Sequence, residues 1–253
     1  ENLFLSFSSG AVSFALWYGY NHVQIGGDAI ESVALFASSM QWSFLFSQFS
    51  VVIGGVLVSK LLHGSKELLA FNRYSAWLPV CLMASFVILI PEIHMFVFGE
   101  GFSTQVMSPL LNIVLLSTIF NALKSSLQRS IIAKNISWLS TLGNFIWLIL
   151  FITATLVIEF ADVYMFALIF LLSNIATFLL MLPLYLKFEV LKVSDYFSVT
   201  SIVLFFQTTC VVGVSLLDLD IFYRFIFLLL INGLVLFVFL MRFSKNMSIT
   251  ETS

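Results

Sequence analysis

Long apolar runs alternate with short polar breaks along the whole chain. A membrane-spanning helix needs about 20 mostly apolar residues, because it rises about 1.5 Å per residue through a hydrocarbon core about 30 Å thick. Eight runs reach that length, so the pattern predicts an all-α, polytopic transmembrane bundle forming one domain over residues 1–253. The predicted helices lie near residues 3–22, 33–59, 74–96, 108–129, 136–158, 163–186, 197–217 and 221–241.

The composition supports a lipid environment. Hydrophobic residues make up 60% of the chain and charged residues only 9%, against about 25% charged in soluble domains. So few charges cannot cover the surface of a water-soluble protein. We therefore expect the lipid bilayer as a partner and no nucleic acid.

The basic residues gather in alternate breaks. Ten of the eleven lie at the end of the second, fourth, sixth or eighth run or in the break after it: Lys60, Lys66, Arg73, Lys124, Arg129, Lys134, Lys187, Lys192, Arg242 and Lys245. Short cytoplasmic loops retain Lys and Arg, so this pattern predicts eight spans with both termini in the cytoplasm. Arg224 is the exception. Asp220 precedes it by four residues, the favourable order for a helical ion pair, which predicts a salt bridge between them.

The second predicted helix carries a polar stripe. Ser38, Gln41 and Gln48, with Gly55 and Ser59, fall within an arc of about 100° on a helical projection. Glutamine facing lipid is expensive, so the stripe is expected to face other helices or a water-filled path. Hydrogen bonding between helices and the lining of a cavity both remain open.

The fourth predicted helix shows a tighter stripe. Ser117, Asn121, Lys124 and Gln128 lie within about 40° of one another. The cation of Lys124 either snorkels to the nearer interface or faces an internal site. These four residues are candidates for a substrate cavity.

Chemistry-bearing groups are otherwise sparse. Glu92 and His94 lie near the extracytoplasmic end of the third helix and are candidates for proton coupling, although two residues apart they point to different faces. The alternative is the edge of an interfacial loop. The sequence contains no phosphate-binding glycine loop, no metal-ligand spacing and no nucleophile beside a histidine. We therefore expect no catalytic residues, no metal, no cofactor and no enzyme activity.

Three segments resemble polysaccharide and O-antigen flippases, which belong to a superfamily with multidrug exporters. The segment GGDAIESVALFASSMQWSFLFSQFSVVIGG at 26–55 is similar to the family's loop glycine, acidic residue and "lF.as.QW..l" helix. The segment MFVFGEGF at 95–102 is similar to its "lfG.gF" loop, and FNALKSSLQRSIIAKNISW at 120–138 extends the resemblance. The family's usual proline late in the second helix is absent, and Gly54 and Gly55 stand near its place.

The resemblance implies a function and an architecture. It places the chain in the MATE-like C-terminal lobe of a two-lobed carrier in the bacterial cytoplasmic membrane, with the N-terminal lobe missing. Such a carrier flips an undecaprenyl-linked oligosaccharide, an O-antigen or capsule repeat unit, and other glycan-assembly proteins are candidate partners. The polar stripes would then line the cavity, and Lys124 or Arg129 would attract the lipid-linked diphosphate.

Three alternatives remain open. A multidrug or small-molecule exporter of the same fold would want a carboxylate near the middle of a span, which the sequence does not supply. A membrane enzyme that polymerises glycans would want large, basic extracytoplasmic loops, and these breaks are short. An inactive membrane fragment is the third alternative.

Overall fold

The structure is helical throughout its regular segments. The computed structural model describes residues 29–62, 66–99, 104–157, 163–191, 198–217 and 219–250. Within them it contains eight α-helices: α2 (Ala29–Leu62), α3 (Lys66–Leu89), α4 (Glu92–Phe98), α5 (Thr104–Ala133), α6 (Trp138–Val157), α7 (Val163–Lys187), α9 (Val199–Ser215) and α10 (Ile221–Thr250). The predicted all-α class is confirmed for these residues, whereas the predicted helix at 3–22 lies outside them.

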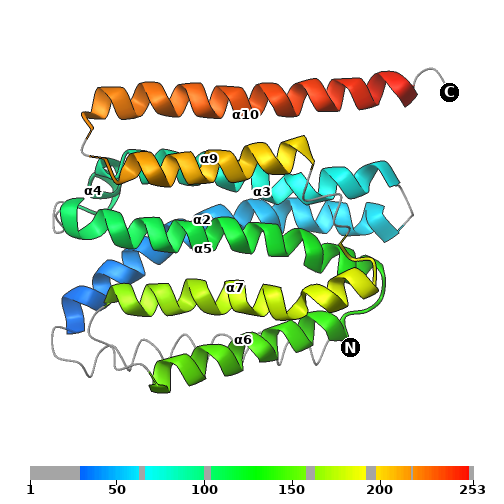
Figure 1. Ribbon diagram of the computed structural model, residues 1–253, viewed down its shortest axis with the longest axis horizontal. Coiled ribbons are helices and arrows are strands. Elements are labelled where there is room, and N and C mark those ends of the chain that lie inside the picture. Colours follow the sequence, from blue (N-terminus) through cyan, green and yellow to red (C-terminus); the bar gives the residue numbers. More distant parts are fainter. Residues whose placement is uncertain are drawn as a thin grey trace.

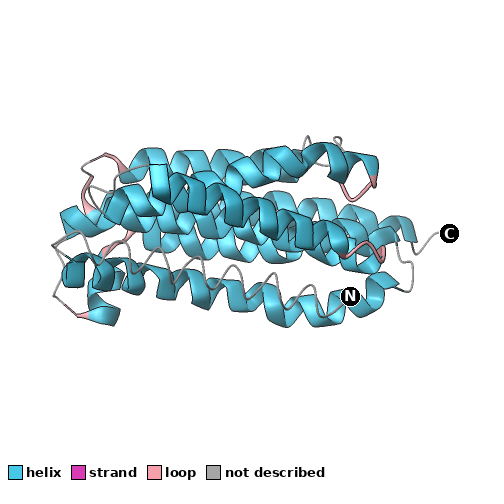
Figure 2. Ribbon diagram, turned by 90° about the horizontal axis from the view of Figure 1, so that it is seen from below, coloured by secondary structure: helices cyan, strands magenta, loops and turns pink. Residues whose placement is uncertain are grey.

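The long helices run side by side and alternate in direction (Figure 1). The C-terminal ends of α2, α5 and α7 and the N-terminal ends of α3, α6 and α9 lie at one end of the bundle, called here the Lys134 end, and α4 lies at the other, the α4 end. In the turned view the loops are again confined to these two ends (Figure 2). This arrangement suits a bilayer, because irregular backbone exposed to hydrocarbon would leave polar groups unsatisfied.

Five described helices contain segments long and apolar enough to cross a membrane: Ala34–Val58, Met107–Ala133, Trp138–Val157, Val163–Lys187 and Ile221–Met241. A bent pair, Tyr74–Leu89 with Glu92–Phe98, makes a sixth if it counts as one span. Helix α9, predicted as a span at 197–217, is apolar but has only 17 residues. The chain is a polytopic membrane protein with five or six candidate spans in the described residues.

The third predicted helix is interrupted. Residues 74–96 were expected to form one helix, but the axis turns by 92° between α3 and α4. Pro91 explains the break, because proline has no amide hydrogen to donate and disfavours helical geometry at the residue before it, Ile90. The short α4 ends at Gly99, whose φ of 94° is a conformation that glycine adopts without strain.

Helix α5 is the centre of the bundle. It packs against α2, α3 and α7, while α6 packs against α7 on one side and α9 and α10 pack against α3 on the other (Figure 1). Leu110, Leu111 and Leu115 of α5 are fully buried. Large apolar side chains on α10, such as Phe222 and Leu230, point outward, which costs little where the surroundings are lipid chains.

Candidate functional site

A cavity of about 230 Å³ opens beside α5 within the membrane-spanning helices. We call it the Lys124 chamber. Its lining comes from α5, α6 and α7: Asn121, Lys124, Ser125, Gln128, Asn144, Trp147, Phe170 and Asn174. Lys124 lies about 14 Å along the helix from Ala133, the end of its span, at 1.5 Å per residue. The chamber therefore brings a cation and four amide side chains together between three helices.

Lys124 is held by a residue on another helix. Its Nζ donates a 3.0 Å hydrogen bond to Oδ1 of Asn174 on α7. Asn174 is itself fixed, because its Nδ2 donates to the carbonyl oxygen of Phe170, one turn earlier, at 2.9 Å. Asn174 is buried. The ammonium group is thus oriented by the protein at the chamber wall instead of extending freely towards an interface.

A second cavity, of about 260 Å³, adjoins the first. We call it the Met40 chamber. It is lined from α2, α3, α5 and α7 by Met40, Ser43, Phe44, Ser47, Val80, Thr118, Asn121, Ala122, Ser125 and Phe170. Its surface is mainly apolar, interrupted by hydroxyls. Asn121, Ser125 and Phe170 line both chambers, so the two cavities share a wall.

The predicted stripe on α5 is partly gathered at these chambers. Asn121, Lys124 and Gln128 line the Lys124 chamber. Ser117 lines neither of them and is 1% exposed, and its Oγ has no hydrogen-bond partner among the described residues. The next residue, Thr118, lines the Met40 chamber.

Arg129 also lies outside the chambers. It is 5% exposed and fixed to α3. Its Nε donates to Oδ1 of Asn72 at 2.6 Å, and Nη2 donates to the Asn72 carbonyl oxygen at 3.1 Å and to Oγ of Ser75 at 3.2 Å. The Arg129 side chain also lies beside Gly54 of α2. In this structure Arg129 joins three helices near the Lys134 end.

The predicted stripe on α2 does not meet either chamber. Ser38 donates to the Leu35 carbonyl oxygen of its own helix at 2.9 Å, Gln41 is exposed and Gln48 is half-buried. A neighbouring face of α2 lines the Met40 chamber instead, through residues at helical spacing: Met40, Ser43, Phe44 and Ser47.

Glu92 and His94 are held apart on α4. Glu92 Oε1 lies 3.2 Å from Nη2 of Arg224 on α10, forming a salt bridge. The predicted pairing of Arg224 with Asp220 is wrong. Asp220 Oδ1 instead accepts from the Phe222 amide at the start of α10, where the first amides of a helix lack intrahelical acceptors.

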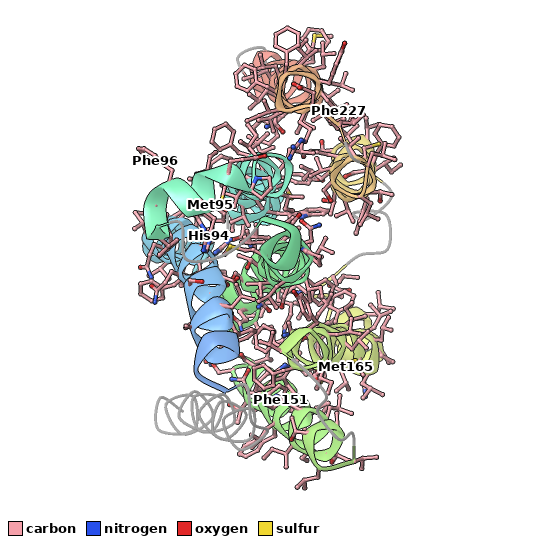
Figure 3. All side chains as sticks on the ribbon, turned by 90° about the vertical axis from the view of Figure 1, so that its left-hand side faces the viewer. His94, Met95, Phe96, Phe151, Met165 and Phe227 are labelled. Carbon is pink, nitrogen blue, oxygen red and sulfur yellow. The ribbon has the colours of Figure 1, made fainter. Side chains whose placement is uncertain are left out.

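His94 faces α2. Its Nδ1 accepts a 2.9 Å hydrogen bond from Nε1 of Trp42, and its ring lies 4.5 Å from that of Phe98. His94 is fully buried, whereas Phe96 on the outer side of α4 is 91% exposed (Figure 3). The hydrogen bond connects α4 to α2, and the proton coupling expected of Glu92 and His94 stays a prediction.

Three polar residues, Ser85, Gln207 and Asn232, form a hydrogen-bonded triad where α3, α9 and α10 pack together, and it was not predicted from the sequence. Gln207 of α9 donates through Nε2 to Oδ1 of Asn232 on α10 at 2.6 Å and to Oγ of Ser85 at 3.3 Å, and Ser85 donates to Asn232 at 3.1 Å. The signal in the sequence was a single amide within each of two apolar runs, Gln207 and Asn232, because an amide inside a membrane needs a hydrogen-bond partner.

Among the described residues, no group of three or more His, Cys, Asp or Glu side chains is placed to hold a metal ion. No protein-family model, no curated protein and no solved structure matches the chain.

Proposed function

We propose that the protein is a membrane carrier that moves a lipid-linked oligosaccharide across the bilayer. The observation that carries the proposal is the Lys124 chamber, in which a lysine and four amide side chains line a cavity between membrane-spanning helices. Polar groups at this depth are costly unless they are satisfied or used. A chain that needed only to span the bilayer would have no use for such a cavity.

The chemistry of the lining suits this cargo. The ammonium of Lys124 attracts phosphate oxygens. The amides of Asn121, Gln128 and Asn144 can donate to and accept from sugar hydroxyls. The resemblance of the Gln41–Trp42 segment to O-antigen and polysaccharide flippases adds a second, independent line of support.

A multidrug exporter on the same scaffold is less well supported. A carrier of organic cations is expected to present a carboxylate to its cargo. Among the described residues, neither chamber is lined by Asp or Glu, and the Lys124 cation at the wall would repel such a cargo. Transport of an anionic or neutral polar cargo therefore fits the lining better.

The proposal is tested in the source organism with the chromosomal gene deleted. Plasmid-borne protein should restore surface glycan. Lys124→Ala should reduce the restored amount about tenfold or more, the effect of losing a charge-assisted hydrogen bond of about 1.5 kcal/mol or more. Asn121→Ala removes a neutral hydrogen bond of about 0.5 to 1.5 kcal/mol and should reduce it by about two- to tenfold. Lys187→Ala removes an exposed cation at the end of α7 and is the matched control. Equal membrane levels are verified by immunoblot. Full export by both chamber variants would contradict the proposal, and an inactive fragment would restore none.

A further inference from the structure

The Met40 chamber has a composition unlike that of its neighbour. Apolar groups of Met40, Phe44, Val80 and Ala122 form most of its wall. We propose that the two chambers form one divided site for an amphiphilic anion, with the phosphate in the Lys124 chamber and the adjoining hydrocarbon chain in the Met40 chamber. This inference rests on the proposed function and deepens it, because it states which parts of the cargo the protein holds.

The shared wall supports a single ligand. Asn121 and Ser125 stand four residues apart on α5 and line both cavities, and Phe170 of α7 does the same. The cavities, of about 230 and 260 Å³, are each smaller than the roughly 300 to 1,000 Å³ of usual small-molecule sites. A ligand that passes from one to the other would use a site of ordinary size.

The Lys124 chamber has unused hydrogen-bond donors. The Lys124 ammonium has three N–H groups, and among the described residues one of them is bound, by Asn174. Trp147 also lines the chamber, is 4% exposed, and its Nε1 has no hydrogen-bond partner in the described part of the chain. Buried donors are costly without an acceptor. Oxygens of a phosphate are acceptors only, and they suit both groups.

The Met40 chamber, in contrast, offers a ligand few free hydrogen-bonding groups. Its few polar groups are largely engaged within the protein: the Thr118 hydroxyl donates to the Val114 carbonyl oxygen at 2.8 Å, and that of Ser125 donates to the Asn121 carbonyl oxygen at 3.0 Å. What such a wall offers a ligand is mainly apolar surface. The expected occupant is a flexible hydrocarbon chain, which the hydrophobic effect favours in proportion to the area buried.

The two walls together define the ligand class. A free phosphate would leave the Met40 chamber empty, and a neutral prenyl alcohol would leave the Lys124 donors without an anion. A chain joined directly to a phosphate satisfies both. The inference therefore predicts that chain and phosphate must be on the same molecule for tight binding.

The test is photocrosslinking with farnesyl phosphate that carries a diazirine at the far end of its chain. The probe is added to the full-length protein in nanodiscs of neutral lipid, and labelled peptides are identified by mass spectrometry. We expect label on residues 40–47 of α2 or 118–122 of α5, competed at least fivefold by excess unlabelled farnesyl phosphate. Neither inorganic phosphate nor farnesol at the same concentration should compete to that extent.

Two variants and one control test the division of the site between the chambers. Ser43→Phe fills the Met40 chamber and should reduce chamber label at least fivefold, whereas Leu45→Phe, at an exposed position on the same helix outside both linings, should not. Lys124→Gln should reduce the same label by removing the anchor for the phosphate.

The outcomes separate this inference from the proposed function. Label confined to outward-facing residues such as Leu230, or label that farnesol competes equally well, would overturn the divided site even if glycan export remained intact. Competed chamber label in a protein that exports no glycan would support the divided site and count against the proposed function. Because the mapping uses the unmodified protein, it remains decisive if a variant fails to fold.

Discussion

Asn72 is expected to be a sensitive position for the stability of the bundle. It lies buried on α3 and connects that helix to α5 through three side-chain hydrogen bonds. Its Oδ1 accepts from Arg129 at 2.6 Å, and its Nδ2 donates to the Ser126 carbonyl oxygen at 3.0 Å and to the Ser130 hydroxyl at 3.2 Å. The substitution Asn72→Ala removes all three and leaves buried polar groups on α5 short of partners.

The size of the effect follows from these bonds. Neutral hydrogen bonds between membrane helices contribute about 0.6 kcal/mol on average, and a bond to a charged group about 1.5 to 3 kcal/mol. The two neutral bonds and one charged bond therefore predict a loss of about 3 kcal/mol. The Asn72 backbone carbonyl still accepts from Arg129 after the substitution, so the loss should not reach the cost of a fully orphaned buried cation.

The assay is reversible unfolding of purified protein in mixed micelles titrated with sodium dodecyl sulfate, followed by circular dichroism. The control is Gln128→Ala, which truncates an exposed side chain next to Arg129 and should change the free energy of unfolding by less than about 0.5 kcal/mol. Arg129→Lys should reproduce much of the Asn72→Ala loss, because lysine lacks the planar fork. If Asn72→Ala were as stable as the control, the reasoning about this cluster would be refuted.

Three further predictions use the same titration. The pair Glu92 and Arg224 is partly exposed, so a double-mutant cycle with Glu92→Gln and Arg224→Gln should give a coupling energy of about 0.5 to 1 kcal/mol, and zero coupling would mean that the ion pair does not hold α4 to α10. Asn232→Leu deprives Gln207 and Ser85 of their shared acceptor and should lower the free energy of unfolding by about 1 to 2 kcal/mol; an equally stable variant would show that the triad contributes nothing. Gly99→Ala forces a Cβ into a φ of 94° and should cost about 1 kcal/mol or more, and a gain in stability would contradict the strain expected there.

Helix positions followed well from the sequence because they depend on local composition. Any apolar run of the required length must satisfy its own backbone in lipid, and a helix is the only open-chain way to do so. The break at Pro91 was missed for the same reason: the apolar run continues past it, and a hydropathy pattern does not register that α4 turns by 92°. Pro91 was the signal of that turn in the sequence, and Gly99 was the signal of the end of α4.

The candidate site was harder to predict from the sequence than the helices, because it depends on how the helices face one another. The stripe on α5 contains three residues that line the Lys124 chamber, since one tight arc on a central helix points in one direction. On α2 the polar stripe and the chamber-lining face differ, and the latter is marked by Ser43 and Ser47 among apolar residues. The hydrogen bond between Lys124 and Asn174, fifty residues later, depends on the register between α5 and α7. The hydrophobic pattern of a single sequence does not reveal that register.

We propose that the chambers bind cargo during its movement across the bilayer. This role is tested most directly by reconstituting the full-length protein into proteoliposomes with a fluorescent polyprenyl-diphosphate oligosaccharide and measuring how fast the sugar on the inner leaflet becomes accessible to an external lectin. We expect an exposure rate at least tenfold above that of protein-free vesicles, lost in Lys124→Ala and retained in Lys187→Ala. A wild-type rate equal to that of protein-free vesicles, or an undiminished rate in Lys124→Ala, would contradict it.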